Sequence, residues 1–425
     1  MSVHPENAGS KREQREATAL SLLLSPRVSL LAASSFAGIA IIISSYVINA
    51  MDRTLFPLIL PEVAREYGFN LPEAGLMATV FTIGMALAGV PSGYLMSHVA
   101  RRTVAQIGLF VFSAATLVTV AAGGFADMLI YRALTGVGEA MQLTALLAIL
   151  AASFMRFRGA AVGALNCAFG VGAVLGPLLG AQILSFYGSW RAPMIAFGML
   201  GFLLMLLFSL AARTAITEAP AVSREAAPSG ASSVWNRNTL VLTLLSAIAG
   251  LSIFGFLGMY PTYLRAQLHF SATNAGRVMS IYGLGVLVSV LGGFIGDRFS
   301  TKPVLVISFL FASLNGWLLF NGPRGFFPQA TLAFAFGVIF SGAIYVNIAA
   351  GYTRAVAPHL TGRASGVFVT SFYAAASIAG YVIGWLAQNF GWTLAGDLQL
   401  GAACIMGAVL ALALRPERSA IPRRV

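Results

Sequence analysis

The sequence predicts an all-α membrane protein, and three observations lead to this fold class. Of the 425 residues, 58% are hydrophobic and only 9% are charged, whereas soluble proteins carry about 25% charged residues. Apolar runs of about twenty residues, the length of a helix that crosses a bilayer, recur from Ser29 to Leu414. Glycine occurs 45 times, which suits the close packing of helices in lipid.

Twelve apolar spans follow one another along the chain. Each is predicted to be a helix, because a β-strand that crosses a bilayer would be much shorter. The first, second, fifth and eleventh spans are long, so we expect these helices to tilt or to protrude. In chain order, the spans cover residues 30–56, 73–97, 104–123, 128–153, 160–186, 191–212, 239–264, 274–296, 303–321, 328–352, 364–388 and 395–414.

A polar loop divides these spans six and six. It is rich in Pro, Gly, Ser and charged residues, a composition typical of a flexible cytoplasmic linker. The predicted organisation is an N-terminal tail (1–29), a six-helix bundle (30–212), the linker (213–238), a second six-helix bundle (239–414) and a C-terminal tail (415–425).

The two halves repeat each other at an offset of 200 residues. The stretch from Gly93 to Val104 is similar to that from Gly293 to Val304, and Pro61 and Pro261 share the same offset. We infer a duplication. Two parallel halves related by an axis along the membrane normal are a known plan of transporters.

The basic residues predict the orientation in the membrane. If both termini are cytoplasmic, 19 of the 26 Lys and Arg residues fall on the cytoplasmic side, as the positive-inside rule requires. The net charge of +12 therefore reflects the membrane topology, and we expect no nucleic-acid partner. Cys167 and Cys404 both fall in apolar spans, so we expect neither a disulfide nor a metal site.

Asp52 and Arg53 stand side by side in the first apolar span. Each costs about 2.5–3.5 kcal/mol at the centre of a membrane helix, so the pair indicates a function: the coupling of a proton to the movement of an anion. The two side chains point about a quarter turn apart, so neither is expected to be the main partner of the other. Arg132 and Glu139 project from roughly one face of the fourth span. We expect Arg53 to face a central cavity and Asp52 to turn towards Arg132 or Glu139.

Burial favours the neutral form of a carboxyl group, whereas a nearby guanidinium favours its charged form. A carboxyl group balanced between these effects can exchange a proton near neutral pH, as a proton carrier requires. Asp52 and Glu139, with Arg132 beside them, are therefore the candidates for proton coupling. The alternative is a fixed ion network that locks one conformation.

Polar and aromatic residues on otherwise apolar spans are candidates for lining the cavity, with packing as the alternative for each. As a group they suit a mid-sized anion with some apolar or aromatic surface. They are Tyr46, Asn49, Gln142, Asn166, Tyr260, Tyr345, Asn347, Phe372 and Tyr373.

Two further groups are candidates for gating. Charged residues at a cytoplasmic helix end can form a latch, or they can set the topology alone. Glycines four residues apart form a smooth helix face that serves as a hinge, as a seal between bundles, or in ordinary packing. The charged candidates are Asp297, Arg298 and Lys302. The glycine candidates are Gly172 and Gly176, together with Pro177, which follows Gly176 directly.

Four motifs resemble those of the major facilitator superfamily, and the likeness covers about residues 30–414. The resemblance implies twelve transmembrane helices in two six-helix bundles, with transport by alternating access. The motifs run from Gly293 to Lys302, from Arg132 to Ala140, from Gly172 to Gly180 and from Gly188 to Arg191.

Within the superfamily, Asp52 and Arg53 together with Arg132 and Glu139 are similar to the anion:cation symporter branch. This resemblance implies that Arg53 contacts the substrate anion and that Asp52 and Glu139 are proton sites. A resemblance to spinster-type lipid carriers rests on Asp52 and Arg53, on the stretch from Gly138 to Ala140 and on that from Thr79 to Phe81.

Met85 and Tyr373 stand where sugar-acid carriers often have Tyr and an amide, which favours a less hydroxylated substrate. We expect a proton-coupled secondary active transporter of a small organic anion, a carboxylate, with the proton as coupling ion and no other cofactor. The alternative is an exporter of lipids or amphipathic drugs by proton antiport. The chain lacks the common hydrolase and phosphate-loop motifs, so we expect no enzyme. We expect a monomer surrounded by membrane lipid, in the cell membrane and specifically a bacterial inner membrane.

Overall fold

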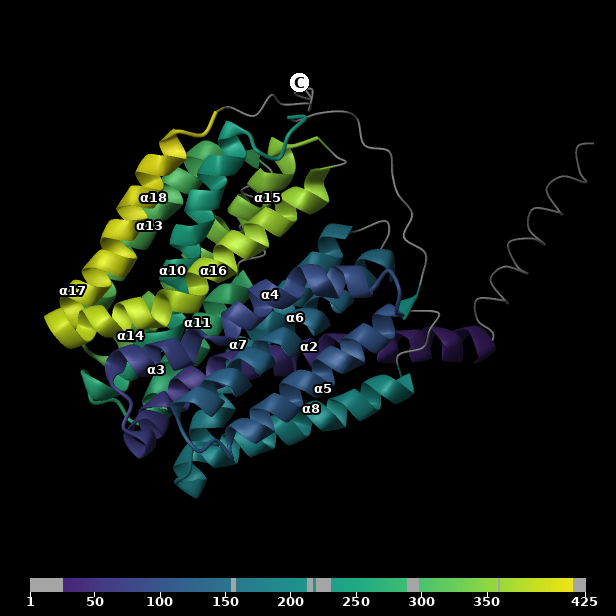
Figure 1. Cartoon of the computed structure of the whole chain (residues 1–425), viewed down its shortest axis with the longest axis horizontal. Coiled ribbons are helices and arrows are strands. Elements are labelled where there is room, and N and C mark those ends of the chain that lie inside the picture. The colour runs from purple at the N-terminus through teal and green to yellow at the C-terminus, as the bar shows by residue number, and fades with distance from the viewer. Residues whose placement is uncertain are drawn as a thin grey trace, which may run out of the picture.

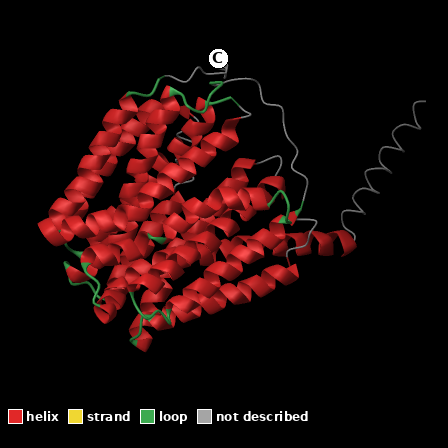
Figure 2. Ribbon diagram, in the orientation of Figure 1, coloured by secondary structure: helices red, strands yellow, loops and turns green. Residues whose placement is uncertain are grey.

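The computed structural model describes residues 26–153, 158–211, 217–218, 231–288, 298–357 and 360–415. Within these ranges, helices are joined by short loops, and a single isolated bridge pairs Ala231 with Val356 (Figure 2). The predicted all-α class is thus confirmed.

The first group of helices, coloured purple to teal in Figure 1, is built around the long helix α2. Helix α2 packs on α7 and α8, α5 packs on α6 and α8, and α4 packs on α6. The group comprises α2 (Pro26–Tyr67), α3 (Leu71–Thr79), α4 (Phe81–Leu95), α5 (Arg101–Thr119), α6 (Phe125–Ser153), α7 (Arg158–Tyr187) and α8 (Arg191–Ala211).

The second group, coloured green to yellow, lies against the first (Figure 1). Helix α10 packs on α16 and α18, α11 packs on α14, and α13 packs on α18. The group comprises α10 (Arg237–Ala266), α11 (Ala272–Val288), α13 (Thr301–Asn321), α14 (Phe326–Gly337), the π-helix η1 (Val338–Tyr345), α15 (Val346–Ala355), α16 (Thr361–Phe390), α17 (Trp392–Gly396), the π-helix η3 (Asp397–Ala402) and α18 (Ala403–Leu412).

The membrane spans agree with the prediction in number as far as the chain is described. Eleven helical stretches in the described ranges are long and apolar enough to cross a membrane, and the predicted span 274–296 falls on α11, described to Val288. The predicted end of the first span at residue 56 is wrong, because α2 runs on to Tyr67 with Pro57 and Pro61 inside it. Neighbouring helices can satisfy the backbone groups that such prolines leave free.

Several predicted features lie wholly or partly outside the described residues. They include residues 1–25 and 416–425 of the two tails, most of the linker 213–238, and the gating candidate Asp297. The boundaries of the two predicted bundles stay a prediction.

Three seams join the two groups of helices: α7 on α11, α16 on α3 and α4, and α2 on α10. Glycines on α11 allow the first of these approaches, because a Cβ at Gly276 would lie 2.6 Å from the carbonyl oxygen of Pro177. Gly172 and Gly176 instead face α2, where an added Cβ would meet Val47 O at 2.5 Å and Met51 O at 2.7 Å, respectively. The expectation that these two glycines seal the bundles against each other is therefore wrong, and their role as a hinge stays a prediction.

Close helix contact within the first group provides a test of the packing. Gly136 of α6 faces α4, and an added Cβ would overlap the carbonyl oxygen of Phe81. We expect Gly136→Ala to lower the free energy of unfolding by about 1–3 kcal/mol, the usual cost of overpacking, and to lower the melting temperature of the purified protein in detergent. Gly366→Ala is the matched control, since an added Cβ there meets nothing within 4 Å. Equal melting temperatures for the two variants would contradict this packing.

Candidate functional site

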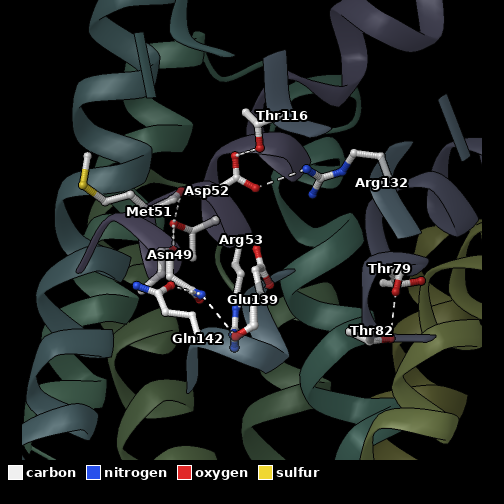
Figure 3. Close-up of polar contacts among 12 residues, drawn as sticks. Asn49, Met51, Asp52, Arg53, Thr79, Thr82, Thr116, Arg132, Glu139 and Gln142 are labelled. Atoms are coloured by element: carbon white, nitrogen blue, oxygen red, sulfur yellow. Dashed lines mark hydrogen bonds and ion pairs between the residues drawn. The ribbon is translucent and has the colours of Figure 1, made fainter. Parts of the chain in front are cut away.

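Two buried ion pairs connect α2 to α6 (Figure 3). Arg53 Nε lies 2.8 Å from Glu139 Oε2, and Arg132 Nη1 lies 3.2 Å from Asp52 Oδ2. The four side chains are at most 7% exposed. As predicted, Asp52 and Arg53 are not paired with each other, and Asp52 turns towards Arg132.

The Asp52–Arg132 pair is enclosed by protein. Thr116 Oγ1 donates a hydrogen bond to Asp52 Oδ1 at 3.0 Å, and the Arg132 guanidinium lies 4.3 Å from the centre of the Phe56 ring. Neither charged residue is among those that line the central cavity. Because breaking a buried ion pair leaves an uncompensated charge, this pair fixes α2 against α6.

The Arg53–Glu139 pair has a different environment, because Arg53 reaches the cavity wall. Behind it, Asn49 Nδ2 donates to Gln142 Oε1 at 2.9 Å, and Gln142 Nε2 donates to Ser45 Oγ at 3.0 Å. Arg53 Nη2 and Glu139 Oε1 are buried and have no hydrogen-bond partner within the described part of the chain. Buried polar atoms are normally hydrogen-bonded. Arg132 Nε and Nη2 and Asn49 Oδ1 also lack a partner in the described chain, but of these residues it is Arg53 that belongs to the described cavity wall.

A cavity of about 660 Å³ lies between the two groups of helices, a size usual for small-molecule sites. Arg53 is the single charged side chain among the described residues that line it. The first group also contributes Tyr46, Thr54, Pro57, Ala78, Phe81, Leu143, Leu147, Leu165, Asn166 and Phe169. The second contributes Ile253, Phe254, Leu257, Gly258, Tyr282, Val286, Ser341, Tyr345, Val346, Ala349, Ala350, Thr353, Ser365, Phe368, Phe372 and Tyr373.

Five predicted cavity residues besides Arg53 are in this wall: Tyr46, Asn166, Tyr345, Phe372 and Tyr373. The other predicted liners are not among the described residues of the wall.

Four expected liners are thus corrected, because each lies off the described wall and makes at least one hydrogen bond within the protein. Asn49 and Gln142 bond to each other behind Arg53. Tyr260 donates its hydroxyl to Gln329 within an aromatic cluster, and Asn347 Nδ2 donates to the carbonyl oxygen of Ala343 at 2.7 Å.

Apart from Phe372, the apolar liners of the second group were not predicted, although the repeat held a signal for two of them. At the offset of 200 residues, Arg53 and Thr54 correspond to Ile253 and Phe254, and both members of each pair line the cavity. Ile253 and Phe254 were not predicted because only polar and aromatic residues that stand out in an apolar span were candidates, and both residues are ordinary in such a span.

Polar contacts join the two groups at the end of α2 and along α3. Glu62 of α2 forms an ion pair with Arg265 of α10, and both side chains are partly buried. Nearby, the amide of Leu71 donates to Gln388 Oε1 of α16 at 3.2 Å, and Thr79 Oγ1 donates to the carbonyl oxygen of Ser377 at 3.0 Å. The Glu62–Arg265 pair was not predicted, because charges at the end of a span are as readily explained by solvation.

The predicted latch residues Arg298 and Lys302 make no ion pair with another described residue. Their expected neighbour Asp297 is outside the described ranges. At the same end of the first group, Glu218 accepts hydrogen bonds from the amides of Arg101 and Arg102 at 3.2 and 3.0 Å. The linker thereby caps the N-terminus of α5, where a carboxylate is favoured by the helix dipole.

Helices grouped about a central cavity, with one cation on its described wall, fit the plan of a membrane transporter. The chain belongs to the Major Facilitator Superfamily, whose model matches residues 42–285 and 242–424.

Relatives and solved structures agree with this family. The chain is 24% identical to the probable sulfoacetate transporter SauU of Cupriavidus necator, over 87% of this chain and 91% of the relative. It is 25% identical to the hexuronate transporter of Bacillus subtilis, over 61% and 66% of the two chains. A bacterial homologue of the lysosomal transporter spinster, solved in an inward-facing, unoccupied conformation, has the same fold, with a TM-score of 0.68, 16% identity and coverage of 89% and 95%.

The Glu62–Arg265 pair is expected to hold the two groups together at the end where α2 terminates. We place a cysteine at the cavity residue Thr54 in a variant lacking the native cysteines, and expect Glu62→Gln to raise its labelling by a membrane-impermeant reagent applied from that end. An increase of about fivefold is expected if the contact contributes about 1 kcal/mol to closure.

The matched control is Glu66→Gln. Glu66 pairs with Arg191 at 2.6 Å but joins α2 to α8 within the same group, so labelling should stay at the parent rate. Equal labelling of all three proteins would show that the Glu62–Arg265 pair does not contribute to closure.

Proposed function

We propose that this transporter carries a small organic anion, a carboxylate, in symport with a proton by alternating access. One observation carries the proposal: Arg53, the charged residue of the described cavity wall, holds the buried Glu139 carboxylate and keeps a further buried nitrogen without a hydrogen-bond partner in the described chain. Two relatives, the hexuronate transporter of Bacillus subtilis and the probable sulfoacetate transporter of Cupriavidus necator, support an anionic substrate.

In the proposed mechanism, a substrate carboxylate competes with Glu139 for the Arg53 guanidinium. Bidentate contact between a carboxylate and an arginine is among the stronger polar interactions, so the anion binds where Arg53 has a free nitrogen. Glu139 then loses part of its cation partner while it remains buried, which favours its neutral form. Glu139 therefore takes up a proton as the anion binds, and the site moves with no added net charge.

Asp52 and Arg132 have a supporting role in this scheme. Their pair lies away from the described cavity wall, and Thr116 donates a hydrogen bond to Asp52. A substrate that exchanges with Glu139 leaves this pair untouched, so α2 and α6 stay together through the cycle. Of the predicted proton sites, Glu139 is therefore the one we assign to coupling.

Alternating access would come from rocking of the two groups of helices about the central site, as in other transporters built from two halves. The contacts at the Glu62–Arg265 end would break as contacts at the Arg298 and Lys302 end form. We propose these two basic residues, with Asp297, as gating groups on the cytoplasmic side.

The second candidate function is export of lipids or amphipathic drugs by proton antiport. The apolar and aromatic lining of the cavity favours it. The two functions differ in their need for Arg53, since a neutral amphiphile makes no ion pair with a guanidinium.

Arg53→Ala is expected to abolish uptake of a labelled carboxylate into proteoliposomes under an inward proton gradient, because no other described cation faces the cavity. Arg65→Ala is the matched control, since Arg65 is on the same helix and is exposed. The carboxylate is chosen from a panel by its ability to raise the melting temperature. Undiminished uptake by Arg53→Ala would overturn the proposal.

Glu139→Gln is expected to separate anion exchange across the membrane from proton-driven accumulation of the anion. Glutamine resembles the protonated acid, so exchange of internal for external anion should persist while acid-driven accumulation falls to the equilibrium level. The control is Glu66→Gln. It removes a charge from the exposed end of α2, the helix that carries the partner of Glu139, and should leave accumulation unchanged. Proton-driven accumulation by Glu139→Gln at the parent level would exclude Glu139 as the coupling site.

A further inference from the structure

Next to Arg53, much of the cavity wall is formed by aromatic side chains. Tyr46 and Tyr373 lie beside the Arg53 guanidinium. From Tyr373 the rings continue without a break: its ring centre lies 6.0 Å from that of Phe254 and 5.2 Å from that of Phe372. The site therefore joins one positive charge directly to an aromatic surface.

This aromatic wall is a connected cluster on α10, η1 and α16. The ring of Phe372 meets those of Phe254 and Tyr345 nearly edge to face, at 5.9 and 5.1 Å with interplanar angles of 73° and 69°. Phe368 extends the cluster, 5.2 Å from Tyr345. Aromatic rings favour such offset and edge-to-face partners, so a further ring placed in the cavity would extend an existing arrangement.

The π-helix η1 is what brings Tyr345 to this wall. It interrupts the helix between α14 and α15, and two of its residues, Ser341 and Tyr345, line the cavity. Such π-helical turns recur at functional sites, where they redirect a side chain.

We propose that the substrate is a monoanion with an aromatic body, its carboxylate on Arg53 and its ring against Tyr373, Phe254 and Phe372. This inference rests on the proposed anion transport and narrows its substrate class. A second carboxylate would be buried with no cation in the described wall, which is unfavourable. The hydroxyls of a sugar acid would face the rings of Phe254 and Phe372, which offer no hydrogen bonds, and a site rejects a substrate whose polar groups it leaves unpaired.

The test is equilibrium binding to the full chain in lipid nanodiscs by titration calorimetry. The probes are phenylacetate, hexanoate, gluconate, phthalate and benzyl alcohol, which vary the ring, the hydroxyls and the charge in turn. We expect phenylacetate to bind about tenfold more tightly than gluconate and phthalate and about fivefold more tightly than hexanoate. Benzyl alcohol, which lacks the charge, should bind more weakly than phenylacetate by a similar factor.

Variants then locate the preference in the wall. Phe254→Leu and Phe372→Leu keep apolar volume but remove a ring, and each should weaken phenylacetate binding about fivefold and leave hexanoate binding unchanged. Phe311→Leu is the matched control, because Phe311 is 58% exposed on the outer surface of α13. The comparison of ligands on the parent protein decides the proposal even if one variant fails to fold.

Three outcomes would overturn the inference, and they differ in what they say of the transporter. Equal or tighter binding of hexanoate, gluconate or phthalate, lost in Arg53→Ala, rejects the aromatic monoanion and leaves anion transport standing. Binding of phenylacetate that is indifferent to Arg53→Ala, or matched by benzyl alcohol, rejects anion transport as well. No binding by any of the five probes rejects the aromatic monoanion.

Discussion

The cost of a buried charge is the constraint on which the rest of the structure depends. In the described part of the chain, two acids and two arginines meet between α2 and α6, all of them almost fully buried. Their charges sum to zero, so the site is stable only while each charge keeps a partner. An anion that takes Arg53 from Glu139 disturbs this balance, and a proton on Glu139 restores it. Coupling in this scheme follows from neutrality, without any separate sensor for protons.

The same constraint explains why the two halves of the repeat differ. Arg53 and Thr54 of α2 correspond to Ile253 and Phe254 of α10, and all four residues line the cavity. The first half thus supplies the charge with its buried support, and the second half supplies an apolar wall that needs none. A charge on both sides would require a second buried network. The divided arrangement gives the cavity a polar end and an apolar end, which orients a bound amphipathic anion.

Much of the fold could be predicted because composition and span length act over the whole chain. The pairing of Asp52 with Arg132 was also within reach, since helix geometry separates Asp52 from Arg53. The partner of Arg53 was not, because it depends on how α2 rotates against α6. Asn49 and Gln142 were misplaced for a related reason: polar residues in an apolar helix can satisfy each other as well as a substrate. Of the ring cluster, Tyr345, Phe372 and Tyr373 were predicted as liners. Phe254 and Phe368 were not, because phenylalanines are ordinary in a membrane helix and only the structure brings those of α10 and α16 together.

Irregular backbone occurs at the helices that line the cavity. Pro57 lies inside α2, one residue, Val80, separates the helices α3 and α4, and the π-helix η1 precedes α15. In a membrane such irregularities are tolerated where protein or a cavity satisfies the freed backbone groups, and Pro57, Phe81 and Tyr345 all reach the cavity wall. Prolines and π-turns are also the usual points at which helices bend. The residues that line the cavity therefore lie at the points where the helices bend. A ligand that fills the cavity contacts the parts of the helices that must move when the two groups rock.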